Sequence, residues 1–231
     1  MQKMGPEGLN PIYERTWVVI VAAGDGSRFG ARKQFAVVDG RPLVSFAIAT
    51  ARSVAAGVVV VVPPDMSRTS LGQPVDESNA MVDSVVAGGA TRTESVRAGL
   101  LAVPDHAEVV VVHDAARPAA SADLFRAVVD AIAEGADAAV PALAVSDTLK
   151  RVDGDLVLST VARDGLVAVQ TPQAFRAGVL REAHAKGESA TDDAALVEAL
   201  GATVRIVPGE SSNLKLTTPG DLALLESVLR R

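Results

Sequence analysis

Residues 17–30 read WVVIVAAGDGSRFG, an apolar run of strand length that passes directly into a glycine-rich loop. The segment Trp17 to Ala22 has the continuous apolar character of a strand that is buried on both faces of a parallel sheet. The loop brings backbone N–H groups to the carboxyl end of that strand, which is the edge where open parallel sheets bind ligands. This stretch therefore predicts an α/β fold with a site at the end of its first strand.

The rest of the chain alternates strand-length hydrophobic runs with longer segments of helical periodicity, which is typical of βαβ units wound into a mostly parallel sheet flanked by helices. Further strands are expected at residues 58–62, 81–86, 109–113, 138–143, 203–207 and 213–216. Helices are expected at 42–57, from 91 onward, at 121–134, 177–186 and 191–200, and from 218 to the end. Thr91 and Glu94 have the spacing of a capping box. We expect a single α/β domain over residues 17–231.

The pattern changes between residues 147 and 169. Leu149–Val152 and Leu156–Thr160 flank the turn sequence Asp153-Gly154-Asp155, which predicts a β-hairpin. A hairpin here interrupts the βα alternation, so we expect an arm of residues 147–169 that leaves the main sheet.

The first sixteen residues are polar and are broken by glycine and proline. They lack the apolar stretch of a secretory signal, and we expect them to form a disordered arm. The longest apolar runs are far shorter than the ~20 residues that span a bilayer. These features predict a soluble, cytoplasmic protein.

Composition excludes several kinds of site. The 231 residues contain no cysteine, which rules out disulfides, thiolate metal sites and thiol nucleophiles. Hydrophobic residues make up 48% of the chain and aromatic residues only 3%, so the core must consist of Val, Ala, Leu and Ile. The net charge of −6 argues against broad attraction to nucleic acid or to an anionic membrane. An anionic ligand would need a local cluster of basic residues.

The glycine-rich loop is the first candidate site, since Arg28, Arg32 and Lys33 place three positive charges within six residues. Such a density of charge suits a triphosphate better than the pyrophosphate cradle of a dinucleotide site. No acidic residue ends a second strand about twenty residues further on, as the dinucleotide fingerprint requires. A dinucleotide loop and a tight turn without a ligand remain the alternatives.

Two further segments follow strands. Asp114 ends a strand, where a carboxylate can hold Mg²⁺ together with substrate phosphates, and Arg117 can bind a phosphate. The alternative is that Asp114 caps the following turn and pairs with Arg117. His113 is expected to be a packed core histidine. Gly89 and Ser95, at a glycine turn before a helix, are candidates to contact the edge of a base.

Seven motifs occur in order along the chain: AAGDGSRFGARKQF (22–35), GGATRTESV (88–96), VHDAARP (112–118), SDTLK (146–150), QTPQ (170–173), ATDDA (190–194) and NLKLTTPGDL (213–222). Together they resemble the 2-C-methyl-D-erythritol 4-phosphate cytidylyltransferases of the non-mevalonate isoprenoid pathway. The resemblance implies a Rossmann-like nucleotidyltransferase sheet in a homodimer, with the hairpin arm reaching across to the partner subunit. It also implies transfer of CMP from CTP to the polyol phosphate, release of pyrophosphate, and Mg²⁺ as the cofactor.

The same resemblance implies roles for individual residues. The catalytic set is Arg28, Lys33 and Lys215. The CTP-binding set is Ala22, Ala23, Gly24, Gly26, Gly89, Ser95, Asp114 and Ala115, with Asp114 also binding the metal. The set for the polyol phosphate is Arg117, Thr148, Arg163, Thr171 and Thr191, some of them across the dimer interface. Because both reacting phosphates are anionic, cationic side chains and positioning would supply most of the catalysis.

Three other functions remain open from the sequence. A ribitol-5-phosphate cytidylyltransferase shares the nucleotide motifs and differs mainly in the acceptor site. An NAD(P)-dependent oxidoreductase could use the same glycine loop. A nucleotide-binding protein that has lost its activity would keep the fold.

Overall fold

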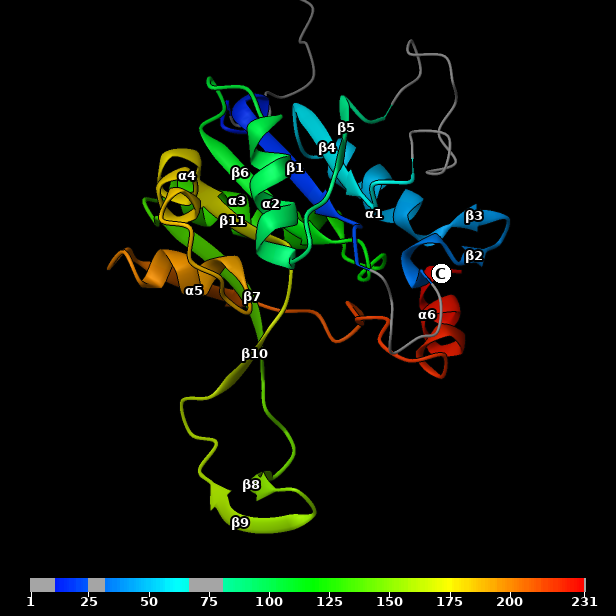
Figure 1. Ribbon diagram of the computed structural model, residues 1–231, viewed down its shortest axis with the longest axis vertical. Coiled ribbons are helices and arrows are strands. Elements are labelled where there is room, and N and C mark those ends of the chain that lie inside the picture. Colours follow the sequence, from blue (N-terminus) through cyan, green and yellow to red (C-terminus); the bar gives the residue numbers. More distant parts are fainter. Residues whose placement is uncertain (1–10, 25–31, 67–80, 231) are drawn as a thin grey trace, which may run out of the picture.

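Runs of valine form the centre of a β-sheet that lies between two layers of helices (Figure 1). In the computed structural model the residues described are 11–24, 32–66 and 81–230. Strands β4 (Gly57–Val62) and β6 (Val109–Asp114) read GVVVVV and VVVVHD, and both are buried at every position. A strand covered on both faces needs apolar residues throughout, and β-branched valine suits such a position.

Within the described residues the main sheet has eight strands. Besides β4 and β6 they are β1 (Thr16–Val21), β5 (Ser84–Ala87), β7 (Ala138–Ala144), β10 (Val167–Val169), β11 (Gln173–Arg176) and β12 (Val204–Pro208). The order is β10-β7-β11-β6-β1-β4-β5, and β12 pairs with β7. All ladders are parallel except those of β10 and β11, which run antiparallel to their neighbours. The predicted fold class, a mostly parallel sheet flanked by helices, is confirmed.

Alternate residues of each central strand face opposite layers of helices. Val58 and Val60 pack with α1 (Leu43–Arg52) and α3 (Ala122–Ala133). Val59 and Val61 pack with helices of the other face, which are α2 (Arg92–Leu101), α4 (Ala177–Ala185) and α5 (Asp193–Glu198). The two clusters make the expected aliphatic core.

A smaller cluster joins the end of the chain to the region after the glycine-rich loop. Strands β2 (Val37–Val38) and β3 (Arg41–Pro42) form a short antiparallel pair after the 3₁₀-helix η2 (Lys33–Phe35). Helix α6 (Asp221–Leu229) lies beside this pair (Figure 1). Val38, Leu43, Leu216 and Leu225 form the buried centre of the cluster. The cluster packs the NLKL segment (residues 213–216) against the domain, close to the candidate site.

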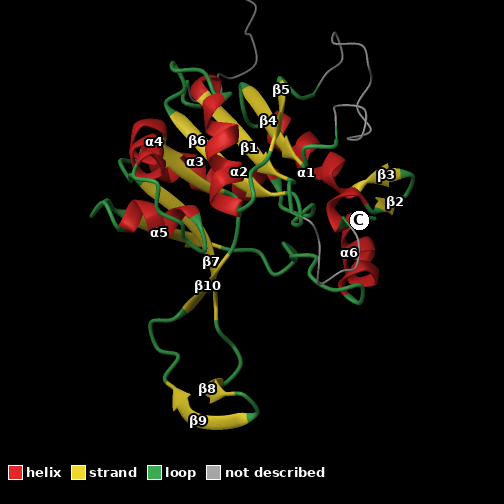
Figure 2. Ribbon diagram, in the orientation of Figure 1, coloured by secondary structure: helices red, strands yellow, loops and turns green. Residues whose placement is uncertain are grey.

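The predicted hairpin is present and extends away from the main sheet (Figure 2). Strands β8 (Leu149–Asp153) and β9 (Leu156–Val161) pair with each other as a separate two-stranded sheet. Gly154 in its turn has a φ of 57°, the left-handed conformation that glycine adopts without strain. Leu156, Val157 and Leu158 are 59–66% exposed in the single chain, so the arm carries apolar side chains that the domain does not cover.

The structure corrects three sequence-based expectations. The helix expected at 42–57 ends at Arg52, and Gly57 instead begins β4, where its backbone lies against the Trp17 ring. The strand expected at 213–216 is an extended segment without a ladder, whose Leu216 N–H donates to the Ala116 carbonyl at 2.8 Å. Short antiparallel strands β10 and β11 were not expected at all.

The N-terminal arm expected over residues 1–16 is ordered at its end. Tyr13–Arg15 form the 3₁₀-helix η1, and buried Tyr13 donates its hydroxyl to Asp130 at 2.6 Å. Burial and the neighbouring carboxylate raise the pKa of Tyr13 well above its usual value. Met1–Asn10 lie outside the described residues. Among the described helices, none combines the length and the apolar character needed to cross a bilayer.

We predict that Gly57→Ala destabilises the domain by ~1–3 kcal/mol, because overpacking of a filled core costs about that much. A Cβ at this position would lie 2.5 Å from carbon atoms of the Trp17 ring. Urea unfolding followed by the fluorescence of Trp17, the single tryptophan of the chain, measures the effect. Gly178→Ala is the matched control, because that helical glycine faces open space, and it should leave stability unchanged or slightly raised. Equal stability of the two variants would contradict the packing argument.

Candidate active site

The carboxyl ends of neighbouring strands bring the predicted segments together at one edge of the sheet. Strands β1 and β6 are parallel, and Val21 lies opposite Asp114 in their register. The loops that follow therefore start side by side, and the Ala115 N–H donates to the Val21 carbonyl at 3.0 Å. On the other side the Ala22 N–H donates to the Val61 carbonyl at 2.8 Å. The expected location of a site at these strand ends is thus supported by the geometry.

The start of the glycine-rich loop is held by a residue that the sequence did not single out. Gln34 is buried, and its side-chain amide donates to the carbonyls of Ala22 at 2.6 Å and Gly24 at 2.8 Å. These two bonds fix the backbone as it leaves β1. Gln34 lies inside the quoted motif, in η2, and its buried amide follows the rule that buried polar groups are hydrogen-bonded.

The predicted cations of this loop are only partly described. Gly26 and Arg28 lie outside the described residues, as does the side chain of Lys33 at the start of η2. Arg32 forms two hydrogen bonds of 2.8 Å with the carboxylate of Asp65. Arg32 therefore contributes its charge to the loop as one half of an exposed ion pair with Asp65.

Two consecutive glycines let α2 approach the first loop. A Cβ on Gly88 would lie 2.3 Å from the Ala23 Cβ and 2.8 Å from the Ser95 hydroxyl, and a Cβ on Gly89 would lie 2.4 Å from the Glu94 Cβ. The predicted capping box is confirmed, since the Thr91 side chain accepts from the Glu94 N–H and the Glu94 carboxylate accepts from the Thr91 N–H. Ala23 and the start of α2 are therefore neighbours.

Ser95 is buried, and its hydroxyl donates to the Thr91 carbonyl at 2.9 Å. Its proton is thus already used inside α2. In this arrangement Ser95 can offer a ligand only a lone pair, which limits the predicted contact with a base edge to acceptance of a hydrogen bond.

Asp114 is the centre of an ion-pair cluster at the end of β6. Its Oδ1 pairs with Arg92 Nε at 3.2 Å, and its Oδ2 pairs with Lys215 Nζ at 2.7 Å. Burial by itself would raise the pKa of Asp114, but the positive charges of Arg92 and Lys215 outweigh burial and hold that pKa well below its usual range. The side chain is therefore an anion at every physiological pH.

The alternative expectation for Arg117, that it pairs with the Asp114 carboxylate, is wrong. The Arg117 N–H closes a turn on the Asp114 carbonyl at 2.9 Å, while the guanidinium donates to the Asn213 carbonyl at 2.7 Å. Burial lowers the pKa of Arg117, and the Asp114 charge only partly opposes this effect. Its Nε has no hydrogen-bond partner although it is buried, so Arg117 retains a donor for another group.

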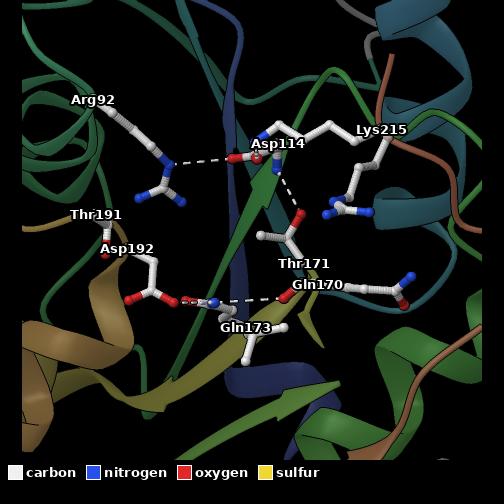
Figure 3. Close-up of a pocket in the computed structure, with 10 residues that line it drawn as sticks. Arg92, Asp114, Gln170, Thr171, Gln173, Thr191, Asp192 and Lys215 are labelled. Atoms are coloured by element: carbon white, nitrogen blue, oxygen red, sulfur yellow. Dashed lines mark hydrogen bonds and ion pairs between the residues drawn. The ribbon is translucent and has the colours of Figure 1, made fainter. Parts of the chain in front are cut away.

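These residues line a pocket of about 220 Å³ (Figure 3). Five of the predicted site residues meet there: Asp114, Arg117, Thr171, Thr191 and Lys215. Five that the sequence did not assign to the site join them: Arg92, Val169, Gln170, Gln173 and Asp192. Thr148 and Arg163 do not, because both belong to the arm: Thr148 directly precedes β8, and Arg163 follows β9, donates to the Ser146 carbonyl and borders a second pocket of about 510 Å³.

The QTPQ segment between β10 and β11 connects the pocket to the C-terminal region. Gln170 accepts from the Glu210 N–H at 3.1 Å and from the Asn213 side chain at 3.3 Å. Asn213 also donates to the Thr171 carbonyl at 2.9 Å. Since Asn213 is fully buried, these bonds fix the backbone two residues before Lys215.

His113 is a packed histidine, as expected. It is fully buried, its ring centroid lies 5.0 Å from that of Phe125, and its nitrogens contact the Arg117 carbonyl at 3.1 Å and the Thr171 hydroxyl at 3.2 Å. Thr171 in turn accepts from the Asp114 N–H at 3.1 Å. Burial lowers the pKa of His113 to about 4, so the ring is neutral at physiological pH. The neutral ring contacts the turn at Arg117 directly and the backbone of Asp114 by way of Thr171.

In the part of the chain that the structure describes, no three His, Asp or Glu side chains are grouped so that they could hold a metal ion by themselves. The pocket offers the carboxylates of Asp114 and Asp192. A Mg²⁺ ion is commonly bound by one or two carboxylates together with substrate phosphates, and Asp114 suits that arrangement.

Comparison with known proteins gives a consistent result. Residues 16–231 match the family described as 2-C-methyl-D-erythritol 4-phosphate cytidylyltransferase. A protein of that name from Streptomyces avermitilis is 42% identical, and the match covers 96% of this chain and 94% of the relative. The crystal structure of the protein of that name from Thermus thermophilus is 40% identical with a TM-score of 0.77, over 92% of this chain and 98% of that one.

Some relatives are longer. The bifunctional enzyme IspD/IspF of Solidesulfovibrio magneticus is 44% identical over 90% of this chain, which spans 56% of that protein. The chain thus spans little more than half the length of this and similar curated relatives.

The position of His113 predicts a specific pH dependence. Between pH of about 6.5 and 4 the unfolded chain binds a proton at this histidine that the native protein does not, so the free energy of unfolding should fall as the pH falls through this window. The loss attributable to His113 is about 3 kcal/mol. Urea unfolding at pH 7 and pH 4 measures it.

In His113→Gln the difference between the two pH values should shrink by about that amount. His106→Gln, at an exposed position, is the control and should keep the difference of the unmodified protein. An unchanged difference in His113→Gln would show that His113 has the same pKa in the native and the unfolded protein, which would contradict the prediction.

Proposed function

The chain belongs to the 2-C-methyl-D-erythritol 4-phosphate cytidylyltransferase family, and from that premise we propose that it transfers CMP from CTP to 2-C-methyl-D-erythritol 4-phosphate. The products are 4-diphosphocytidyl-2-C-methyl-D-erythritol and pyrophosphate. One observation carries the proposal: Arg92, Arg117 and Lys215 gather around Asp114 in one pocket at the carboxyl end of the central strands.

The reaction is a displacement at phosphorus. An oxygen of the acceptor phosphate attacks the α-phosphorus of CTP, and the bond from that phosphorus to the β-phosphate oxygen breaks. Pyrophosphate leaves with the electron pair of that bond. Both reactants are anions, so their approach is opposed until positive charge neutralises it, and positioned cations supply the main catalytic effect. No covalent nucleophile is needed.

The residues at the strand ends divide between the two substrates. We assign the nucleotide to Ala22, Ala23, Gly24, Gly89 and Ala115, whose backbones lie at the ends of β1 and β6 and at the start of α2, together with Gly26 of the glycine-rich loop and Ser95 in the first turn of α2. Arg117, Thr171 and Thr191 line the pocket where the acceptor phosphate would lie. Lys215, together with Arg28 and Lys33, would bind the phosphates of CTP.

We propose Mg²⁺ as the cofactor, held by Asp114 and by oxygens of CTP. The low pKa of Asp114 keeps it ionised, as a metal ligand must be. Lys215 occupies one of its oxygens, but the Lys215 side chain is 44% exposed and can turn from the carboxylate to a phosphate. When bound, the ion would neutralise phosphate charge.

We also propose that the chain acts as a homodimer in which the arms contact the partner subunit. An isolated two-stranded hairpin is marginally stable in water, yet β8 and β9 pair only with each other in the described chain. Leu156, Val157 and Leu158 leave an apolar surface along β9. Thr148 and Arg163, which flank the β8–β9 hairpin in the arm, lie outside the Asp114 pocket of their own chain, so a partner subunit would bring them to a site.

The acceptor is identified by measuring pyrophosphate release from CTP with 2-C-methyl-D-erythritol 4-phosphate and, separately, with ribitol 5-phosphate. We expect turnover with 2-C-methyl-D-erythritol 4-phosphate.

The same assay tests the two lysines. We expect Lys215→Ala and Lys33→Ala each to lower kcat by ~10²-fold, as loss of a charge contact in the transition state does. Lys186→Ala, on the exposed end of α4, is the control and should retain full activity.

If only ribitol 5-phosphate supports turnover, the proposed acceptor is wrong and the chain is a ribitol-5-phosphate cytidylyltransferase. Binding of NAD(P)H without affinity for CTP would favour the oxidoreductase. Full activity of both lysine variants would remove them from the catalytic set.

The arm is tested by Leu158→Glu, which places a charge on the exposed apolar face of β9. We expect size-exclusion chromatography with light scattering to give a dimer for the unmodified chain and a monomer for the variant. Leu101→Glu is the matched control, because Leu101 is 86% exposed on α2, away from the arm, and it should remain dimeric. A monomeric unmodified chain, or a dimeric Leu158→Glu, would contradict the proposal.

A further inference from the structure

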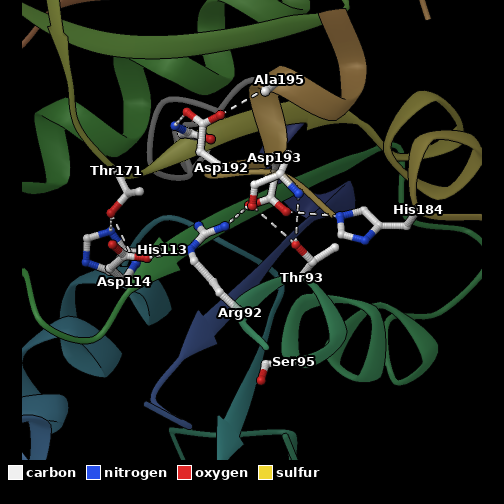
Figure 4. Close-up of polar contacts among 12 residues, drawn as sticks. Arg92, Thr93, Ser95, His113, Asp114, Thr171, His184, Asp192, Asp193 and Ala195 are labelled. Atoms are coloured by element: carbon white, nitrogen blue, oxygen red, sulfur yellow. Dashed lines mark hydrogen bonds and ion pairs between the residues drawn. The ribbon is translucent and has the colours of Figure 1, made fainter. Parts of the chain in front are cut away.

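Asp193 is a buried carboxylate whose role is not explained by its place in the helix. The sequence suggests that Asp192 and Asp193 complement the N-terminus of α5. Asp192 does this alone, since it is the N-cap and accepts from the Ala195 N–H at 3.0 Å. Asp193 is only 1% exposed and directs its carboxylate toward α2 and α4 instead (Figure 4).

The two oxygens of Asp193 have different partners. Oδ2 accepts from Arg92 Nη1 at 2.7 Å, and Oδ1 accepts from His184 Nε2 at 3.0 Å. His184 lies in the last turn of α4, is 3% exposed, and has no hydrogen-bond partner on its other ring nitrogen. A neutral ring therefore carries its proton on Nε2, where it donates to Asp193. His184 thus fixes the direction of the Asp193 carboxylate.

Arg92 is shared by two carboxylates. Its Nε contacts Asp114 at 3.2 Å while its Nη1 contacts Asp193, and the guanidinium borders the pocket (Figures 3 and 4). A guanidinium is planar, so two bonds in different directions fix its orientation. Without the Asp193 charge, Asp114 would be the nearest anion, and Arg92 would be free to turn both of its donors onto Asp114.

We propose that Asp193 is a positioning residue for the transfer described above: held by His184, it keeps the guanidinium of Arg92 at the wall of the pocket and prevents Arg92 from closing on Asp114. The inference rests on the proposed function for its kinetic consequence. Its structural part, the fixed orientation of Arg92, can be measured without any turnover. A purely structural need would not favour this arrangement, because well-packed apolar groups often stabilise as well as a buried ion pair does.

The test is a double-mutant cycle with Asp193→Asn and Arg92→Ala, measured as kcat/KM for pyrophosphate release. Asparagine keeps the shape and removes the charge. We expect Asp193→Asn to lower kcat/KM by about ten-fold or more with Arg92 present, and to have no further effect with Arg92→Ala, because a residue that acts through another is coupled to it. Tyr13→Phe, which removes a buried hydrogen bond at the opposite end of β1, is a destabilised control and should keep normal kcat/KM.

Equal losses from Asp193→Asn in both backgrounds would overturn the inference, since they would show an effect on the fold and not on Arg92. No loss with Arg92 present would overturn it as well. If Asp193→Asn fails to fold, two variants of His184 test the inference instead. Glutamine keeps an N–H donor to Asp193, so His184→Gln should retain activity, whereas His184→Leu should lose it. Equal activities of these two would contradict the role of His184.

A spectroscopic measurement separates this inference from the proposed function. The Nε–H resonance of Arg92, identified by its loss in Arg92→Lys, should be resolved and protected from solvent exchange in the unmodified protein. Its exchange should become faster in Asp193→Asn. If the unmodified chain shows no transfer but this resonance behaves as expected, the proposed function fails and the positioning stands. An unprotected resonance in the unmodified protein would overturn the positioning itself.

Discussion

The shared carboxylate of Asp114 is the contact on which the arrangement of the site depends. It binds Arg92, 22 residues earlier in the chain, and Lys215, 101 residues later. One anion thus connects the start of α2, the end of β6 and the extended segment before α6. Removing a single partner from such a buried cluster leaves an uncompensated charge and is far more costly than a lost surface ion pair. The cluster therefore fixes the relative positions of three segments that no ladder joins.

Local patterns predicted those parts of the fold that local forces determine. The valine runs of β4 and β6 can be read as buried strands, and the Thr91–Glu94 spacing gives the start of α2 correctly. Strand β11 was missed because its sequence, QAFR, follows a proline and has no β-branched residue; it is a strand because β6 and β7 flank it. The segment 213–216 has strand-like alternation, but no neighbouring strand is available, and Leu216 is buried in the cluster under α6 instead.

In the candidate site, too, local motifs indicate some of the residues but not the long-range contacts between them. Asp114, Arg117 and Lys215 could be found from their motifs, but the pairing of Asp114 depends on long-range contacts that no local pattern contains. The sequence also contains a signal for Arg92. Arg92 is the first residue of α2, where a positive charge opposes the helix dipole, and the adjacent capping box already explained the segment structurally. A cation in that unfavourable place requires nearby anions, and Asp114 and Asp193 provide them.

A net charge of −6 is compatible with the proposed binding of polyanions, because two cations of the pocket, Arg92 and Lys215, are paired with the internal carboxylate of Asp114. In the described pocket Arg92 and Lys215 pair with Asp114, whereas Arg117 bonds the Asn213 carbonyl and retains a buried donor without a partner. Under the proposed function an incoming phosphate would compete for cations that are already positioned, and it would not need to gather them from surface side chains. The site would keep its shape in that exchange only if some of the cations stayed anchored to groups other than Asp114. Asp193 holds Arg92 and the Asn213 carbonyl holds Arg117, which leaves half-exposed Lys215 as the cation that is free to move.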